Sequence, residues 1–235
     1  MRKRKTNTKS TETMGKRKRV TARTPNQKKV LQSIKNSDIV LCEGPAGSGK
    51  THLSVGAAVE YFLRGDVEKI IVTRPIVQAG ERIGFLPGTA EQKLDPYLQP
   101  VFDEFSYFLS QSEIAELKNA RKLEVVPLAL MRGRNFHKAF IIGDEMQNAT
   151  YDQMKMFITR MGIDSKLIIS GDSKQSDLEY RNRGAFNFCL HELVDIERIS
   201  VCYLTGKDIV RNPIIPVVLE RLDEAEKIQR DKGHP

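Results

Sequence analysis

The run of residues from 44 to 51 has the types and the spacing needed to bind a phosphorylated ligand. It matches G-x-x-x-x-G-K-[ST] and consists of Gly44, Pro45, Ala46, Gly47, Ser48, Gly49, Lys50 and Thr51. In such a loop, main-chain N–H groups surround phosphate oxygens at the start of a helix, and glycines let the backbone approach closely. The pattern predicts a nucleoside triphosphate site in which Lys50 reaches the β and γ phosphates and Thr51 ligates Mg²⁺.

Two carboxylates follow a strongly apolar run further along the chain. Residues 139–143 are Ala-Phe-Ile-Ile-Gly, and Asp144 and Glu145 come next. A buried strand that ends in acidic residues delivers them to the carboxyl edge of a parallel sheet, where ligands of open α/β folds bind. We expect Asp144 to hold the magnesium through a water, and Glu145 to activate the attacking water as general base.

A third apolar run, residues 166–170, is followed by Gly-Asp-Ser-Lys-Gln at 171–175. The end of this strand should face the same edge of the sheet. There Gln175 can donate to a γ-phosphate oxygen while Asp172 organises the loop. A simple turn is the alternative interpretation of this segment.

Short apolar runs alternate with longer amphipathic stretches, which is typical of a parallel sheet with crossover helices. Near-continuous apolar strands indicate burial on both faces, so we predict a three-layer α/β domain with a mainly parallel sheet. Residues 74–100 contain many prolines and glycines and predict an ordered, functional loop. The expected strands are 39–43, 69–73, 123–127, 139–143, 166–170 and 199–204, and the expected helices are 51–64, 96–109, 113–120, 151–161, 185–194 and 214–230.

The net charge of +8 is concentrated at one end of the chain. Residues 1–23 contain ten Lys or Arg and one acidic residue, a net charge of +9, whereas the remainder has 28 basic and 29 acidic residues. Such a segment cannot bury enough apolar surface to fold alone, so we predict a disordered basic tail at 1–23 before a domain at 24–235. The tail is either an arm for nucleic-acid phosphates or merely solvated.

Several classes of protein are disfavoured by composition. No apolar run approaches the roughly 18 residues that a membrane span needs, and no signal peptide is apparent, so we expect a cytoplasmic protein. Cys42, Cys189 and Cys202 lie far apart in the sequence. Their spacing argues against a zinc site and against a disulfide framework.

Together these motifs resemble the PhoH-like ATPases, a family related to the nucleotide-binding domain of superfamily 1 helicases. The resemblance runs from about Thr24 to Ile214. It also includes TRPIVQAGE at 73–81, GFLPG at 84–88, MRGR at 131–134, DEMQN at 144–148 and DIVRNP at 208–213. It implies a RecA-like P-loop domain.

The resemblance also implies roles for two further residues. Gln27, in Thr-Pro-Asn-Gln at 24–27, is similar to the glutamine of a helicase Q-motif that recognises adenine, and its amide offers a donor and an acceptor together. A plain helix N-terminus explains Thr24 and Pro25 nearly as well. Arg211 would supply a positive charge to the transferring phosphate.

The leading hypothesis is therefore an enzyme that hydrolyses ATP with Mg²⁺ and is coupled to single-stranded nucleic acid, RNA being favoured. One alternative is a nucleic-acid-binding module that uses ATP as a slow switch, and another is a small-molecule kinase, which residues 171–175 fit poorly. Related helicases complete the site with an arginine from a second domain, and no second RecA-like domain is apparent in this sequence. We therefore expect a homo-oligomer, with a hexameric ring considered, in which Arg211, or else Arg132 or Arg134, reaches the adjacent site.

Overall fold

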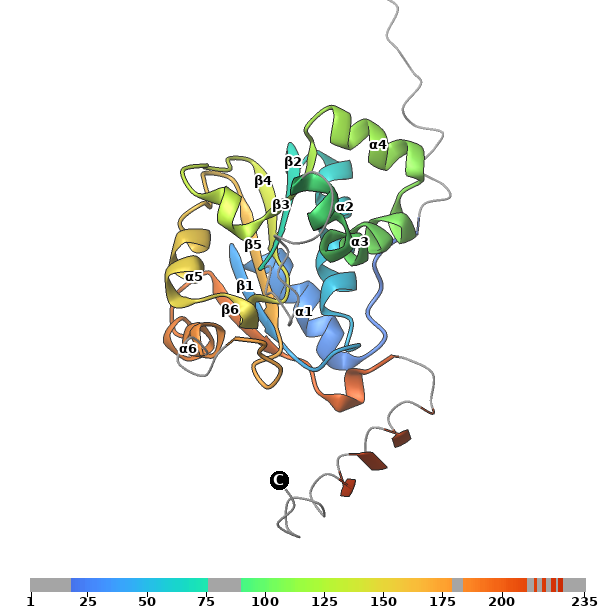
Figure 1. Ribbon diagram of the computed structural model, residues 1–235, viewed down its shortest axis with the longest axis vertical. Coiled ribbons are helices and arrows are strands. Elements are labelled where there is room, and N and C mark those ends of the chain that lie inside the picture. Colours follow the sequence, from blue (N-terminus) through green and yellow to red (C-terminus); the bar gives the residue numbers. More distant parts are fainter. Residues whose placement is uncertain are drawn as a thin grey trace, which may run out of the picture.

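The computed structural model describes residues 18–75, 90–178 and 184–210, with the backbone alone at 90–97, and separate positions between 214 and 225. Its centre is a six-stranded sheet in the order β3-β2-β4-β5-β1-β6 (Figure 1). All five pairs of neighbouring strands are parallel. The strands are β1 (Ile39–Glu43), β2 (Lys69–Arg74), β3 (Leu123–Pro127), β4 (Ala139–Gly143), β5 (Lys166–Gly171) and β6 (Ile199–Tyr203).

Successive residues of the central strands contribute to two different cores, one on each face of the sheet. In β4, for example, Phe140 and Ile142 belong to one apolar cluster and Ile141 to the other. Side chains alternate across a strand, so a strand that is apolar at every position is buried on both faces. The prediction of a three-layer α/β domain with a parallel sheet is confirmed.

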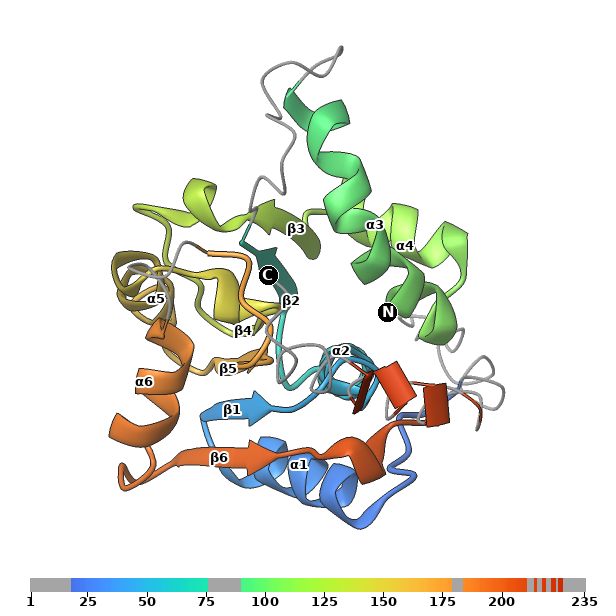
Figure 2. The same ribbon diagram turned by 60° about the horizontal axis from the view of Figure 1, so that its bottom comes forward.

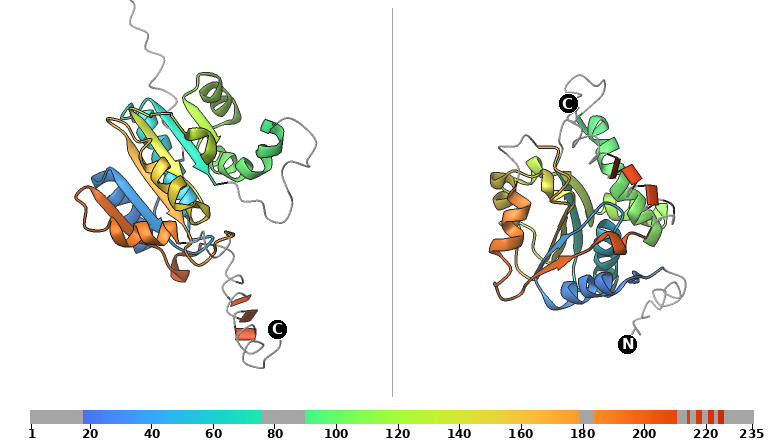
Figure 3. Two further views of the ribbon diagram at one scale, coloured as in Figure 1. Left: turned by 60° about the vertical axis from the view of Figure 1, so that its left-hand side comes forward. Right: turned by 90° about the horizontal axis from the view of Figure 1, so that it is seen from below.

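Two layers of helices cover these faces (Figure 2 and the right-hand view of Figure 3). The first core includes residues of α1 (Pro25–Asn36), α2 (Lys50–Arg64), α3 (Ala90–Phe108) and α4 (Gln111–Asn119). The second includes residues of α5 (Tyr151–Ile158) and α6 (Ala185–Glu192) and of the 3₁₀ turns η3 (Leu128–Met131) and η4 (Met146–Asn148). A third short turn, η6 (Gly206–Asp208), follows β6.

The register of the sheet brings the three segments with candidate site residues to its carboxyl edge. Glu43 at the end of β1 pairs with Gly171 of β5, and Gly143 of β4 pairs with Thr73 of β2 and Ile169 of β5. The chain therefore leaves β1 and β5 at the same level, and β4 two residues earlier, at the same edge of the sheet. The P-loop, the two acidic residues and the 172–175 loop follow these three strands directly.

Two expectations about segment boundaries are wrong. α3 begins at Ala90, so residues 90–100 are helical despite Pro96 and Pro100, and the prediction of a loop is wrong for these positions. Residues 76–89 of the predicted loop lie outside the described residues. The local preference of proline is outweighed by burial of Val101, Phe105 and Phe108 against α2.

Residues 18–23, expected in the disordered tail, instead lie against α2. The Val20 N–H donates to Glu60 Oε1 at 3.0 Å, and Val20 packs against the first core. A Cβ added at Gly56 would come within 2.6 Å of Val20 Cβ, so the glycine provides the space for this contact. Residues 1–17 and most of the expected helix at 214–230 lie outside the described residues.

The described part of the chain contains no helix long and apolar enough to cross a bilayer. The three cysteines are buried and unpaired. In the same residues, no group of three or more His, Cys, Asp or Glu side chains could hold a metal ion alone.

Candidate nucleotide site

The P-loop between β1 and α2 is shaped by main-chain conformations that favour glycine. Gly47 and Gly49 have φ of 81° and 91°, in the left-handed region. Gly44 lies so close to Leu204 that an added Cβ would approach its Cβ to 2.7 Å. Gly49 caps α2 without any side-chain hydrogen bond, which leaves the first N–H groups of this helix for an anion.

Lys50 is the first residue of α2, and its side chain is buried along the loop. Its Nζ donates to the carbonyl oxygens of Gly44 at 2.6 Å and Pro45 at 3.1 Å. A lysine ammonium has three N–H donors, so one remains for a ligand. The loop carbonyls thus hold this cation beside the uncapped end of the helix.

Thr51 and Asp144 meet at the end of β4. The Thr51 hydroxyl donates to Asp144 Oδ1 at 3.1 Å, and the Ser170 hydroxyl donates to the same oxygen at 3.0 Å. Burial raises the pKa of the Asp144 carboxyl, and the neighbouring Glu145 charge raises it further, whereas Arg74 and the two hydroxyls lower it. A buried carboxylate next to a hydroxyl is a hard-oxygen pair that fits Mg²⁺, which binds one or two protein oxygens together with phosphate and water.

Glu145 has an unusual backbone conformation, with φ 54° and ψ 37°. A non-glycine residue in the left-handed region costs of order 1–3 kcal/mol, and such residues cluster at functional sites. Its Oε2 accepts a hydrogen bond from Gln147 Nε2 at 2.6 Å, and its Oε1 lies 3.5 Å from Arg74 Nη2. The side chain lines a cavity of about 550 Å³ together with Gly49, Lys50 and Thr51.

Gln147 links this carboxylate to the loop after β5. It is almost completely buried, and its Oε1 accepts the Asp172 N–H at 3.0 Å. Asp172 in turn accepts the Lys174 N–H through Oδ1, as expected of a residue that organises the loop. Sequence reasoning gave Gln147 and Arg74 no role, because the Gln147–Asp172 and Arg74–Glu145 contacts each join residues that are far apart in the sequence.

Gln175 is not brought into the cavity. Its N–H donates to the Asp172 carbonyl at 3.0 Å, but its side chain is exposed and does not line the nucleotide cavity. The role of Gln175 stays a prediction.

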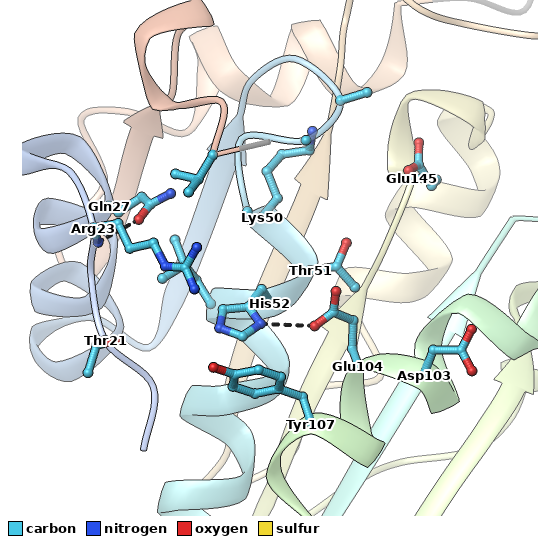
Figure 4. A pocket seen from close by; sticks show the side chains of 15 residues that line it. Thr21, Arg23, Gln27, Lys50, Thr51, His52, Asp103, Glu104, Tyr107 and Glu145 are labelled. Atoms are coloured by element: carbon cyan, nitrogen blue, oxygen red, sulfur yellow. Dashed lines mark hydrogen bonds and ion pairs between the residues drawn. The ribbon is translucent and has the colours of Figure 1, made fainter. Parts of the chain in front are cut away.

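Gln27 lines the cavity but is held by the main chain. Its Nε2 donates to the carbonyl oxygens of Ser48 at 2.9 Å and Asp208 at 3.4 Å, and its Oε1 accepts the Arg23 N–H at 2.8 Å (Figure 4). This amide therefore joins α1 to the P-loop and to η6. An amide oxygen has two lone pairs, so one remains for an external donor.

The Asp208 side chain also anchors the start of α1. It accepts hydrogen bonds from the side chains of Thr24 and Asn26 and from both the N–H and the hydroxyl of Thr205. Burial raises the pKa of the Asp208 carboxyl, but these hydrogen bonds outweigh burial and bring the pKa below its ordinary value. The start of α1 is thereby tied to the segment that follows β6.

The end of the cavity away from Glu145 is lined by aromatic and charged side chains for which the sequence predicted no role (Figure 4). His52 lies 4.9 Å from Tyr107, centroid to centroid, and its Nδ1 is 3.0 Å from Glu104 Oε2 (Figure 4). Arg23 also lines this end. These residues come from α2, α3 and the segment before α1, and their proximity depends on tertiary packing.

The three arginines considered as phosphate contacts lie differently. Arg211 is outside the described residues, but Val210 before it lines the cavity and its N–H lies 3.4 Å from the Gly47 carbonyl. Arg134 is paired with Glu124 at 2.6 Å. Neither Arg132 nor Arg134 lines the nucleotide cavity of its own chain.

Comparison with solved structures relates the fold to nucleotide-binding proteins. The large terminase of a thermophilic bacteriophage, solved in complex with ADP, superimposes with a TM-score of 0.51 at 14% sequence identity. The superposition covers 84% of this chain and 49% of the terminase. The likeness is one of fold, that of a RecA-like P-loop domain.

Comparison with known sequences identifies closer relatives. A PhoH-like protein of Synechocystis sp. is 41% identical over 207 residues, covering 88% of this chain and 63% of the relative. A PhoH-like protein of Mycobacterium tuberculosis is 43% identical over 203 residues, and Protein PhoH of Escherichia coli is 36% identical over 203 residues. These alignments cover 58% and 56% of the two relatives, so the chain spans about three fifths of the length of the relatives it matches.

A family model supports the same assignment over most of the sequence. The model described as PhoH-like protein matches residues 19–223. This range contains the P-loop, the Asp144–Glu145 pair and the 172–175 loop. The chain belongs to the PhoH-like protein family.

Proposed function

We propose that this chain binds ATP with Mg²⁺ and hydrolyses it to ADP and phosphate, with turnover stimulated by single-stranded nucleic acid, RNA being favoured. One observation carries the proposal. The P-loop hydroxyl of Thr51 is bonded to the buried carboxylate of Asp144, and Glu145 opens onto the same cavity. This is the arrangement of residues that phosphoryl transfer in P-loop proteins requires.

Phosphate binding falls to the P-loop and the start of α2. The uncapped N–H groups of the helix and the Lys50 ammonium surround the β and γ phosphates, where positive charge is held in a fixed position. Thr51 and Asp144 are the residues that would hold magnesium. When bound, this ion neutralises negative charge on the phosphate oxygens.

Hydrolysis needs a base beside the γ-phosphate. Glu145 accepts a proton from a water as the oxygen of that water bonds to the γ-phosphorus, and the bond to the β–γ bridging oxygen breaks. Gln147 and Arg74 hold the two carboxylate oxygens, which fixes the direction of the remaining lone pairs. They act as positioning residues.

The nucleobase would occupy the end of the cavity near Gln27. The free lone pair of Gln27 Oε1 can accept from the exocyclic amine of adenine, while its other hydrogen bonds keep the amide oriented. Recognition of adenine and the conformation of the P-loop would then both depend on the side chain of Gln27.

Coupling to nucleic acid is supported by the distribution of charge in the sequence. The first 23 residues carry a net charge of +9, which favours binding to the phosphates of a nucleic acid.

A homo-oligomer, with a hexameric ring as the form considered, would allow an arginine of one subunit to reach the nucleotide site of its neighbour. Arg211 is the candidate because it follows Val210 at the cavity.

The test is ATP hydrolysis measured with and without single-stranded RNA, single-stranded DNA and duplex DNA. The proposal predicts Mg²⁺-dependent release of phosphate that single strands accelerate, RNA more than DNA. Tight ATP binding with negligible turnover would support a slow switch instead. Transfer of the γ-phosphate to an added small molecule in preference to water would support a kinase.

A further inference from the structure

The neighbouring helices α5 and α6 (Figures 1 and 2) carry two exposed aromatic side chains that contact each other, Tyr151 and Phe188. The rings of Tyr151 and Phe188 are 5.3 Å apart, centroid to centroid, at 62°. Their exposed fractions are 51% and 48%. The second core is filled by other residues of these helices, such as Phe157 and Phe186, so core packing does not require this pair.

A groove of about 610 Å³ lies beside α5, and its lining from this helix begins at Asp152, the residue after Tyr151. Lys155, four residues after Tyr151 and so on the same side of the helix, lines it together with Arg132 and Arg160. Asp152 is the single carboxylate in the lining. The groove therefore has an excess of two positive charges.

Within the part of the chain that the structure describes, no carboxylate outside the groove forms an ion pair with its cations. Neither Arg132 nor Lys155 forms an ion pair with any residue that the structure describes. Arg160 donates to the carbonyl oxygens of Met156 and Arg134 and to the Thr159 hydroxyl, all of them uncharged acceptors. Arg134, by contrast, is paired with Glu124.

This surface is joined to the nucleotide site by a short, well-anchored segment. Only five residues separate Tyr151 from Glu145. Gln147 within that segment bonds to Glu145 and to the Asp172 N–H, and a capping box of Thr150 and Gln153 fixes the start of α5. A change at Glu145 can therefore be transmitted to α5 without a flexible linker.

We propose that Tyr151, Phe188, Lys155, Arg132 and Arg160 form a binding surface for single-stranded nucleic acid. The aromatic pair stacks on bases, which are accessible in a single strand and enclosed in a duplex, and the cations contact the phosphates. The inference rests on the proposed function and adds to it the place where the strand binds.

The test compares binding of labelled oligo(U) and oligo(dT) of about 12 nucleotides, a typical site size, by fluorescence anisotropy across a salt series. Tyr151→Ala in the full chain should weaken binding about 5- to 100-fold, by the same factor at every salt concentration, because stacking and not charge is lost. Lys155→Ala should reduce the slope of log K against log salt by about 0.7, the value for one phosphate contact on a single strand.

Controls separate this surface from the basic N-terminal segment and from misfolding. Residues 1–23 contain no aromatic side chain, so they cannot account for a loss of stacking. Tyr151→Phe should bind like the unaltered protein, and so should Tyr203→Ala, which removes an aromatic side chain 53% exposed on β6. Binding of a fluorescent ATP analogue should be unchanged in every variant.

Each outcome decides the matter. Suppose that the unaltered protein binds oligonucleotide, and that Tyr151→Ala and Lys155→Ala bind it equally well with the same salt slope. The nucleic-acid surface then lies elsewhere, and the proposed function survives. If the unaltered protein binds no single strand, both proposals fail. If Tyr151→Ala changes only the oligomeric state measured by light scattering, the pair is a contact between copies of the chain, which also overturns the inference.

Discussion

Asp144 is the residue at which folding and the proposed function conflict. Its carboxylate is 3% exposed, and burial is the largest influence that raises its pKa. Keeping a charge in this position therefore costs folding free energy unless a cation is bound. Stability is often sacrificed in this way at functional sites.

Replacement of Asp144 by asparagine should reveal this conflict. In a buffer with EDTA, Asp144→Asn should stabilise the protein by roughly 1 kcal/mol or more, a rise in Tm of about 2–4 °C, because the amide keeps the acceptor for Thr51 and Ser170 without the charge. With Mg²⁺ and ATP the order should reverse, since only the unaltered protein gains stability from the bound ion. Thermal unfolding in both buffers is the measurement, and an asparagine variant less stable than the unaltered protein in EDTA would contradict the account.

Single residues also show what sequence alone could supply. The P-loop and the Asp144–Glu145 pair were found because the chemistry of each lies within a few consecutive positions. The structural roles of Gln147 and Arg74 were missed, because each depends on which strands are neighbours in the sheet. Two of the contacts of Gln27 could not be foreseen either, since Ser48 and Asp208 lie 21 and 181 residues away.

The strands and most helices were predictable because their signal is local. Strand β4, for instance, lies at the residues expected, since five consecutive buried positions leave little ambiguity. The start of α3 and the packing of residues 18–23 were not predictable. Proline content suggested a loop at 90–100, and positive charge suggested a tail, whereas contacts with α2 decide both.

The basic segment can be tested as an element of its own. Residues 1–17 contain seven basic residues and one acidic residue, a net charge of +6, and precede the part that packs on α2. Their deletion should weaken nucleic-acid binding and make log K depend less steeply on log salt. The experiment is a salt titration of the full chain and the truncated chain. An unchanged slope would show that the segment is merely solvated.

For the whole molecule, the account must identify the arginine that contacts the γ-phosphate in addition to Lys50. Of the three arginines considered, Arg132 and Arg134 do not line the cavity of their own chain, and Arg211, outside the described residues, follows Val210, which does. An arginine supplied by a neighbour can accelerate phosphoryl transfer by roughly 10³ to 10⁵. A head-to-tail oligomer would supply it at every site.

Mixing two inactive variants distinguishes an Arg211 that acts on the neighbouring subunit from one that acts on its own chain. If Arg211 acts across an interface, oligomers mixed from Lys50→Ala and Arg211→Ala contain sites with Lys50 from one subunit and Arg211 from its neighbour, so ATPase activity should return. If no activity returns in oligomers shown to have exchanged subunits, Arg211 serves its own chain.

The central claim is that this cavity hydrolyses ATP with Glu145 as the base. It is tested most directly by measuring ATP binding and phosphate release for Glu145→Gln and Lys50→Ala beside the unaltered protein. The glutamine keeps the shape of the side chain but cannot take up the proton, whereas loss of Lys50 removes a cation from the phosphates. The account predicts that Glu145→Gln binds ATP about as well as the unaltered protein and releases phosphate at least about 100-fold more slowly, while Lys50→Ala loses ATP binding. Near-normal phosphate release by Glu145→Gln would contradict it.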